Sequence, residues 1–147
     1  MTITALTSSP VATEILSYNA GIPAGFPSPA ADYMEERIDL NKELVPRPHS
    51  TFVVSCQGDS MINAFIPPRA RLVVDRSLTA KSGDIVLAII NGEFTVKFFK
   101  QNDHNCFLVP ANSKYKDIKV LPEMNMEVWG VVTTIITEVK DVKRCML

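Results

Sequence analysis

The sequence predicts a mainly β protein, with a small, twisted β-sandwich or barrel-like domain that follows a flexible N-terminal arm. Beyond Thr51, short β-branched and aromatic runs alternate with turns, and no long segment has helical periodicity. Before that point, prolines and small residues dominate the chain. The 147 residues, 46% of them hydrophobic, suffice for one domain with a buried core. We therefore expect an arm over residues 1–45 and a β-rich domain over residues 46–147.

Residues 1–31 are predicted to be extended, without packed structure. Four prolines exclude a helix or a central strand here, namely Pro10, Pro23, Pro27 and Pro29. The arm contains two Ala-Gly pairs, Ala20-Gly21 and Ala24-Gly25. Small residues on both sides of a peptide bond fit a narrow protease cleft, which binds extended backbone as an added strand. The alternative is a plain flexible leader in which the Ala-Gly pairs occur by chance.

Residues 32–45 form a transition from the arm to the domain. Asp39 is a suitable N-cap for a single helical turn that ends at Leu44, because Pro46 and Pro48 stop a longer helix. The strands of the domain are then expected at residues 51–54, 71–74, 84–90, 93–100, 106–109, 118–120 and 127–139.

Asn91-Gly92 is the strongest hairpin signal in the chain. A two-residue turn there pairs Ile90 with Glu93 and Val86 with Lys97, and directly opposite residues share a face. The face of Lys97 would contain Val86, Ala88, Thr95 and Phe99, and the other face Leu87, Ile89, Phe94, Val96 and Phe98. Mostly apolar neighbours favour the neutral amine. A useful base would need a pKa about three units below the ordinary value of a lysine, which corresponds to roughly 4 kcal/mol.

The segment Gly58-Asp59-Ser60-Met61 supplies a candidate nucleophile. A serine hydroxyl needs a neighbouring base, and a desolvated lysine can take that role. Neither His49 nor His104 stands in a sequence setting that indicates a catalytic triad. Ser60 with Lys97 is therefore a candidate pair, which the motif alone does not establish. The alternative is that Gly-Asp-Ser is an ordinary turn and that Lys97 is a solvated lysine on an edge strand.

Composition excludes several other functions. The formal net charge is −1 and no basic patch stands out, so direct nucleic-acid binding is not indicated. Cys56, Cys106 and Cys145 are widely spaced, which predicts neither a metal site nor a disulfide framework and favours a reduced, cytoplasmic setting. No apolar run approaches the roughly 18 residues of a membrane span, and the N-terminus lacks the pattern of a secretory signal. No cofactor is expected.

A series of motifs follows in order along the chain, from about Gly25 to about Val132. They are Gly25-Phe26-Pro27-Ser28-Pro29-Ala30-Ala31-Asp32-Tyr33, Arg37-Ile38-Asp39-Leu40-Asn41, Gly58-Asp59-Ser60-Met61, Asp75, Leu78-Thr79-Ala80, Gly83-Asp84-Ile85-Val86, Gly92-Glu93-Phe94-Thr95-Val96-Lys97, Pro110-x-Asn112-Ser113-x-Tyr115 and Trp129-Gly130-Val131-Val132. With these motifs and with Ser60 and Lys97 placed, the chain resembles the UmuD family of LexA-like self-cleaving serine peptidases.

The resemblance implies a role for each matching residue. Ser60 would be the nucleophile and Lys97 the general base, with Thr95 orienting the amine. The backbone N–H groups of Asp59 and Ser60 would stabilise the oxyanion. The cleaved bond would be Ala24-Gly25, because it directly precedes the Phe-Pro-Ser-Pro run, and Ala20-Gly21 would not be cut. Cys56 is expected to be a small buried residue without a chemical role.

The resemblance also implies partners. Members of the family form homodimers, and a recombinase filament on single-stranded DNA stimulates their cleavage in the SOS response. The trimmed product joins an error-prone, Y-family (UmuC-like) polymerase subunit that copies past DNA lesions. One departure from the family is Pro67-Pro68-Arg69-Ala70, which stands where relatives carry Gly-Asp and could alter the turn near Ser60.

Three alternatives to this assignment remain. A LexA-like repressor would need a DNA-binding helix-turn-helix, and the residues before Thr51 have no such pattern. A membrane signal peptidase shares the Ser/Lys chemistry, but the sequence contains no anchor segment. The third alternative is an interaction module in which the β domain binds a polymerase and the Ser/Lys pair is vestigial.

Overall fold

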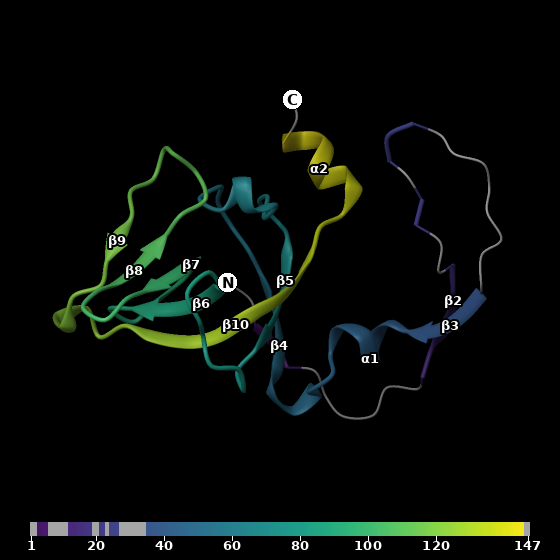
Figure 1. Cartoon of the computed structure of the whole chain (residues 1–147), viewed down its shortest axis with the longest axis horizontal. Coiled ribbons are helices and arrows are strands. Elements are labelled where there is room, and N and C mark those ends of the chain that lie inside the picture. Colours follow the sequence, from purple (N-terminus) through teal and green to yellow (C-terminus); the bar gives the residue numbers. More distant parts are fainter. Residues whose placement is uncertain (1–2, 6–11, 19–20, 23, 27–34, 146–147) are drawn as a thin grey trace. The chain divides into compact units, whose positions relative to one another are not determined.

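The structure, a computed structural model, describes residues 3–5, 12–18, 21–22, 24–26 and 35–145 (Figure 1). The chain divides into two units, Ser9–Pro46 and a larger unit that combines Met1–Ser8 with Arg47–Leu147. Each unit has its own sheet, and the predicted mainly β fold is confirmed. None of the helices in the described ranges has the length and apolar character to cross a membrane.

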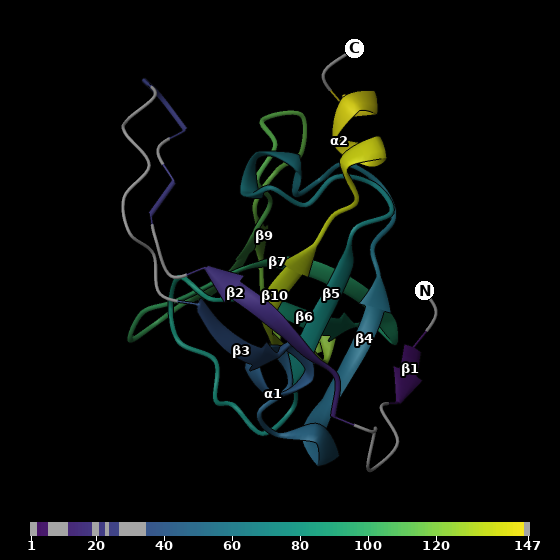
Figure 2. The same ribbon diagram turned by 90° about the vertical axis from the view of Figure 1, so that its right-hand side faces the viewer.

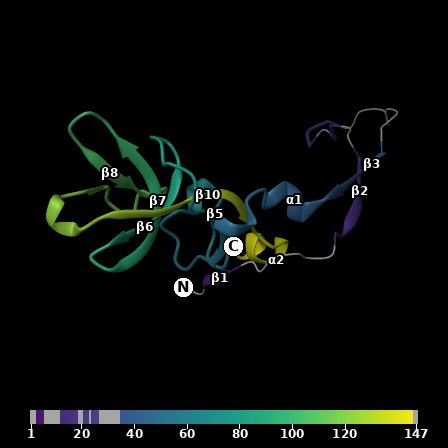
Figure 3. The ribbon, with the colours of Figure 1, turned by 90° about the horizontal axis from the view of Figure 1, so that it is seen from below.

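The larger unit contains an eight-stranded sheet in which every neighbouring pair is antiparallel. In sheet order, its strands are β1 (Ile3–Ala5), β4 (Thr51–Ser55), β5 (Arg71–Asp75), β10 (Glu127–Ile136), β6 (Ile85–Ile90), β7 (Glu93–Gln101), β8 (Cys106–Val109) and β9 (Ile118–Lys119). Figure 2 shows β1, β4, β5 and β10 side by side, and Figure 3 shows β6, β7 and β8 gathered away from β1.

Strand β10 joins the two halves of this sheet, because it pairs with β5 along one edge and with β6 along the other. Each ladder has a register shift, between Val132 and Thr134 towards β5 and between Val128 and Gly130 towards β6. Such bulges increase the local twist of a strand. Three strands separate β4 from β7 in the sheet, yet both strands line one cleft, so the sheet curves back on itself.

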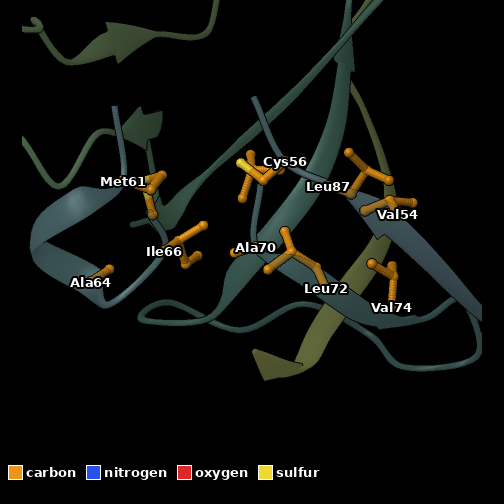
Figure 4. Close-up of a cluster of buried hydrophobic side chains, with 10 residues drawn as sticks. Val54, Cys56, Met61, Ala64, Ile66, Ala70, Leu72, Val74 and Leu87 are labelled. Carbon is orange, nitrogen blue, oxygen red and sulfur yellow. The ribbon is translucent and has the colours of Figure 1, made fainter. Parts of the chain in front are cut away.

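The core lies on both faces of the β6–β7 hairpin. The larger cluster of buried side chains contains Val54, Cys56, Met61, Ala64, Ile66, Ala70, Leu72, Val74, Leu87 and Val96 (Figure 4). A second cluster contains Val86, Ala88, Phe99, Leu108 and Val131. Leu87 and Val96 therefore face one cluster, and Val86, Ala88 and Phe99 face the other, as the hairpin register predicts.

The hairpin itself is confirmed residue by residue. Ile90 pairs with Glu93, Ala88 with Thr95, and Val86 with Lys97. Asn91 and Gly92 have φ angles of 49° and 81°, and this left-handed pair is what a type I′ turn requires. The Asn91 N–H donates to the carbonyl of Met124 at 2.9 Å, which ties the turn to the segment before β10.

The smaller unit contains a two-stranded sheet and one helix. Strands β2 (Glu14–Tyr18) and β3 (Glu35–Asp39) are antiparallel, and α1 (Leu40–Leu44) follows β3. The predicted cap is confirmed, because the Asp39 carboxylate accepts the Asn41 N–H at 2.9 Å.

The prediction that residues 1–31 lack packed structure is wrong for β1 and β2. Both segments are free of proline, and each finds a partner strand far along the chain that accepts its backbone hydrogen bonds. The prolines at positions 10, 23, 27 and 29, together with Ala20, lie outside the described residues.

Two further segments differ from or refine the sequence prediction. The last long strand ends at Ile136 rather than at residue 139, and helix α2 (Val139–Cys145) follows it. The N–H groups of Asp141 and Val142 donate to the Glu138 carbonyl, which turns the chain out of the strand. Short 3-10 turns occupy Pro48–Ser50, Ile62–Ala64 and Pro122–Met124.

The Pro67-Pro68-Arg69-Ala70 segment forms a tight turn. The Ala70 N–H donates to the Pro67 carbonyl at 3.1 Å, and Arg69 has a φ of 73°. Pro68 at the second position and a positive φ at the third are the features of a type II turn, whose third residue is usually Gly or Asn. The Arg69 N–H also donates to the Cys56 carbonyl at 2.9 Å, so the turn is fixed against the segment that leads to Ser60.

Candidate active site

The structure brings Ser60, Lys97 and Thr95 together. Lys97 Nζ lies 3.1 Å from Ser60 Oγ and 2.9 Å from Thr95 Oγ1. A third contact, at 3.0 Å, joins the amine to the carbonyl oxygen of Val96. Thr95 and Lys97 are two residues apart on β7, so their side chains lie on one face of the strand. Ser60 comes from the loop after β4, 37 positions earlier in the chain.

Burial of Lys97 favours its neutral form. The side chain is only 9% exposed, and no carboxylate is hydrogen-bonded to its amine in the described part of the chain. Burial lowers the pKa of Lys97 below its ordinary value, and a negative charge on the nearby Cys56 sulfur would oppose this shift. The amine differs from the expectation of mostly apolar neighbours, because three oxygens surround it. Two hydroxyls and a carbonyl carry no net charge, so desolvation still dominates.

A cleft of about 390 Å³ opens beside the pair. The end of β4 and the loop after it form one wall, and the first half of β7 forms the other. The lining residues are Ser55, Cys56, Gln57, Ser60, Glu93, Phe94, Thr95, Val96 and Lys97. A peptide lying in this cleft would pass Ser60 and the Lys97 amine together.

An aromatic cluster supports the β7 wall of the cleft. Phe94 packs edge-on against Trp129 of β10, with 5.9 Å between ring centroids, and Phe52 of β4 packs against the same indole at 5.1 Å. Above the indole, the Arg76 guanidinium lies 4.4 Å from the ring centroid and donates from Nε to the Trp129 carbonyl. Trp129 thus links three strands of the curved sheet beneath the cleft.

Segment 111–115 holds the loop of the serine in place. The Ala111 N–H donates to the Ser60 carbonyl at 2.8 Å, and the Asn63 N–H donates to the Ala111 carbonyl at 2.9 Å. Asn112 Nδ2 donates to the Asp59 carbonyl at 3.0 Å, and the Tyr115 hydroxyl donates to the Asp59 carboxylate at 2.5 Å. Both the main chain and the side chain of Asp59 are therefore fixed directly before Ser60. We call these two side-chain contacts the Asp59 clamp.

Hydrogen bonding to the Asp59 carboxylate raises the pKa of the Tyr115 phenol, and the negative charge of Asp59 adds to this shift. The phenol therefore stays protonated, and able to donate, further into the alkaline range than an ordinary tyrosine.

Two backbone donors at the serine have no bonded acceptor in the described ranges: the N–H groups of Asp59 and Ser60. Gly58, with a φ of 77°, directly precedes them. Such consecutive N–H groups are the kind of donor that stabilises a developing oxyanion.

The other predicted site residues lie elsewhere. Ala24 and Gly25 belong to the smaller unit, where both are exposed in a bend. Cys56 is 8% exposed and lines the cleft, and burial raises the pKa of its thiol. Among the described residues, no cluster of His, Cys, Asp and Glu side chains is arranged to hold a metal ion.

Sequence reasoning missed the Asp59 clamp. The Pro110-x-Asn112-Ser113-x-Tyr115 motif was the available signal, but it contains no hint of its partner more than fifty positions earlier.

The sequence of this chain is similar to those of known proteins. The peptidase S24-like family matches residues 16–133, a range that includes Ser60 and Lys97. Protein SamA of Salmonella typhimurium is 40% identical over 132 residues, which cover 90% of this chain and 91% of SamA. Protein MucA of Escherichia coli is 41% identical over 117 residues, or 79% of this chain and 80% of MucA. The LexA repressor of Carboxydothermus hydrogenoformans is 39% identical over 99 residues, or 66% of this chain and 48% of the repressor.

The family match covers most of the chain, and the relatives at about 40% identity extend over nearly all of it. The predicted resemblance to UmuD-like and LexA-like proteins is thereby confirmed. A β-rich unit with a serine and a buried lysine at one cleft agrees with that kinship, and the chain belongs to the peptidase S24-like family.

Proposed function

We propose that this protein is a serine endopeptidase that cuts its own Ala24-Gly25 bond with a Ser60–Lys97 dyad. The observation that carries the proposal is the 3.1 Å separation of Lys97 Nζ and Ser60 Oγ at a buried site. Membership of the S24-like family supports self-cleavage as the reaction class.

The reaction starts from the neutral amine. Lys97 Nζ accepts the Ser60 proton while Oγ attacks the carbonyl carbon of Ala24, and a tetrahedral oxyanion forms. The N–H groups of Asp59 and Ser60 donate to that oxyanion. The Lys97 ammonium then returns its proton to the nitrogen of Gly25 as the C–N bond breaks. Water, deprotonated by the same amine, hydrolyses the ester and frees Ser60.

Thr95 orients the base in this scheme. Its Oγ1 and the Val96 carbonyl accept two N–H bonds from the lysine when it is an ammonium. The neutral amine has two N–H groups and one lone pair. When its two N–H groups donate to the Thr95 hydroxyl and the Val96 carbonyl, its lone pair is directed at Ser60. Thr95 is thus a positioning residue.

We extend the proposal to the cellular role that the UmuD-like relatives indicate. Cleavage belongs to the SOS response to DNA damage in the cytoplasm, and a recombinase filament on single-stranded DNA stimulates it. The chain acts as a homodimer, and the trimmed form is the accessory subunit of a Y-family, UmuC-like translesion polymerase. The near-neutral composition supports contact with the polymerase rather than with nucleic acid directly.

Intact-mass spectrometry of purified protein, incubated at alkaline pH, tests the chemistry. The wild type should lose its first 24 residues slowly without any partner, because alkali deprotonates Lys97. Ser60→Ala and Lys97→Ala should stay intact and folded. Ser113→Ala and Lys100→Ala are the matched controls, since both positions are exposed and neither lines the cleft.

Two results would reject the dyad. One is loss of the first 24 residues from Ser60→Ala or Lys97→Ala at the wild-type rate. The other is a wild type that remains intact at high pH, with or without a recombinase filament, which would support a vestigial interaction module.

A further inference from the structure

The outer edge of β4 is covered by the first strand of the chain. β1 lies antiparallel to it, with Ile3 opposite Val54, Thr4 opposite Val53 and Ala5 opposite Phe52 (Figure 2). The inner edge of β4 pairs with β5 over all five residues, from Thr51 to Ser55. In the described ranges, three residues of β1 are therefore the whole cover of the β4 outer edge.

This edge lacks the features that normally protect an exposed strand. Edge strands are usually guarded by charged side chains, prolines or bulges. From Ser50 to Gln57 the sequence contains no charged residue and no proline, and the β4 ladders with β1 and β5 have no register shift. The strand that covers it has matching chemistry, because Thr2-Ile3-Thr4-Ala5-Leu6 is also uncharged and rich in β-branched residues. An uncovered β4 would be a template for another uncharged strand.

The proposed cleavage site lies after β1 in the chain, so cleavage would separate β1 from the β4 edge that it covers. β1 and β2 both precede Ala24-Gly25, which lies in the connection between β2 and β3. Cleavage there would sever both strands from the rest of the chain. Among the described residues of the severed piece, three would still pair with β4 and five with β3.

Cutting changes the pairing of β1 from an intramolecular to a bimolecular event. A flexible tether gives an effective concentration on the order of millimolar, and this advantage disappears when the tether is cut. The contact of β1 with β4 has only three residue pairs, and β2–β3 is a separate two-stranded sheet, which is marginal in water. At micromolar protein concentration the leader should therefore dissociate and leave the β4 edge open.

We propose that the outer edge of β4 is a strand-docking site, occupied by residues 3–5 in the intact chain and vacated by self-cleavage for an uncharged, β-branched strand of a protein partner. The inference rests on the proposed function in one respect only, namely that self-cleavage is the event that exposes the β4 edge. The partner strand would bind the trimmed form by adding to the sheet at β4. Main-chain hydrogen bonds would supply the affinity, and the absence of charge on both strands would supply the selectivity.

Hydrogen exchange of the full-length Ser60→Ala protein tests the cover without requiring cleavage. Successive N–H groups of a strand point to opposite sides, so one set in β4 faces β1 and the other faces β5. The double variant Thr4→Pro/Ala5→Pro removes at least one β1 donor to β4 whichever parity the ladder has, and two prolines disfavour a paired strand over residues 3–5. We expect the outward amides of β4 to exchange at least about tenfold faster in this variant, while the amides facing β5 keep their protection.

A matched control is Ala12→Pro, which places one proline in the same leader outside both strands. It should leave all β4 amides unchanged. Equal exchange of the outward β4 amides in the wild-type leader and the double-proline leader would overturn the proposed cover.

Peptide binding tests the occupant. A labelled peptide of residues 1–8 should bind the double-proline protein at least about tenfold more tightly than the protein with an intact leader, because the edge is open only in the former. The same peptide with prolines at positions 4 and 5 should not bind. Equal binding to both proteins, or self-association of the double-proline protein that the peptide does not reverse, would overturn the proposed occupant.

Self-cleaved wild type connects the two proposals. Its outward β4 amides should lose protection as the leader separates in gel filtration. If the wild type does not cleave at all, the proposed function fails while the double-proline experiments still decide the docking site. If it cleaves and the leader stays bound at micromolar concentration, the vacated edge is wrong.

Discussion

At the scale of single residues, the proposed chemistry depends on one amine that is kept out of water. Lys97 is buried with hydroxyl and carbonyl neighbours and no bonded carboxylate in the described part of the chain, and burial lowers its pKa. An ammonium in that position costs folding free energy at neutral pH, because its solvation is lost without a compensating charge. The same cost favours the neutral amine that the proposed role as a base requires.

This cost predicts that Lys97→Met is more stable than the wild type at neutral pH. Each unit by which the pKa of Lys97 is lowered corresponds to about 1.4 kcal/mol. The folded state releases the proton at a lower pH than the unfolded chain, so wild-type stability rises with pH between the two pKa values. Urea unfolding in Ser60→Ala backgrounds should show the advantage of Met shrinking as the pH approaches about 10.4. A Met variant that is less stable at neutral pH would contradict a desolvated amine.

The Asp59 clamp yields a second prediction, about rate rather than fold. Tyr115→Phe removes the hydroxyl that donates to the Asp59 carboxylate, in a contact at the protein surface. We expect self-cleavage to slow by about tenfold or more, because the backbone donors at Ser60 lose a fixed orientation. The urea midpoint should change little.

Ser113→Ala, at an exposed position of the same segment, is the matched control for loss of a side-chain hydroxyl. Intact-mass time courses compare the two variants. A Tyr115→Phe protein that cleaves at the wild-type rate would remove the clamp from the mechanism. The same slowing at every pH is expected, since the pKa of Lys97 has other causes.

Sequence patterns predict the proposed Ser60–Lys97 pair but not the contacts that support it. The Asn91-Gly92 turn fixes the register that pairs Thr95 with Ala88 and Lys97 with Val86, and this is local information. The arrival of Ser60 at Lys97 depends on a loop between strands that are not neighbours in the sheet. Only the family resemblance predicted that approach. The contact of Tyr115 with Asp59 joins two loops, and neither loop carries a periodic signal.

At the scale of elements, the sequence patterns did not predict β1 and β2, because pairing rather than intrinsic strand propensity defines these two strands. Ile3–Ala5 is three residues long, and Glu14–Tyr18 has only partial alternation. Each becomes a strand because a complementary edge accepts its main-chain hydrogen bonds. The C-terminal strand, in contrast, was predicted too long because Val139 continues its β-branched run into a helix.

The close approach of the paired strands β10 and β5 yields a third prediction. A Cβ atom on Gly130 would lie 2.5 Å from Val74 Cγ1 and 3.3 Å from the Asp75 carbonyl, and Val74 is fully buried. Gly130→Ala should therefore destabilise the larger unit by about 1–3 kcal/mol, as overpacking does in closely packed cores. Gly21→Ala is the control, since a Cβ atom on Gly21 would meet nothing within 4 Å. Equal urea midpoints for the two variants would show that β5 and β10 do not approach this closely.

Asp75 at the end of β5 holds residues 47–50, where the second segment of the larger unit begins. Its carboxylate, 2% exposed, accepts bonds from Arg47 Nε, from the Ser50 hydroxyl and from the N–H and hydroxyl of Ser77. Burial alone would raise its pKa, but these donors outweigh burial and lower the pKa to about 2.

This lowered pKa leads to a fourth prediction. A carboxyl whose pKa is lower in the folded state contributes stability above its unfolded pKa, near 3.9, and loses that contribution as the pH falls towards 2. Asp75→Asn should destabilise the protein at neutral pH, and its difference from the wild type should narrow in acid. Thermal unfolding across that range measures the difference. A gap that stays constant with pH would mean that Asp75 is not ionised in the folded protein.

At the scale of the whole molecule, the two units have complementary tasks in the proposed reaction. The larger unit holds the candidate nucleophile, the base and the cleft, and the smaller unit presents the exposed Ala24-Gly25 bond between two paired strands. The mainly β class and the hairpin that carries the candidate base followed from local patterns. The curvature of the sheet, which brings the two walls of the cleft together, did not follow from local patterns. It arises from bulges in β10, and these are defined only by the pairing of β10 with its neighbours.

The pH dependence of self-cleavage tests the central claim most directly. The rate of loss of the first 24 residues, measured by intact mass without any partner, should rise about tenfold per pH unit while Lys97 is mostly protonated. It should level off above the lowered pKa of that amine. Lys97→Ala should show no such rise. A wild-type rate that is flat from about pH 7 to about pH 10, in protein that remains folded, would contradict Lys97 as the base.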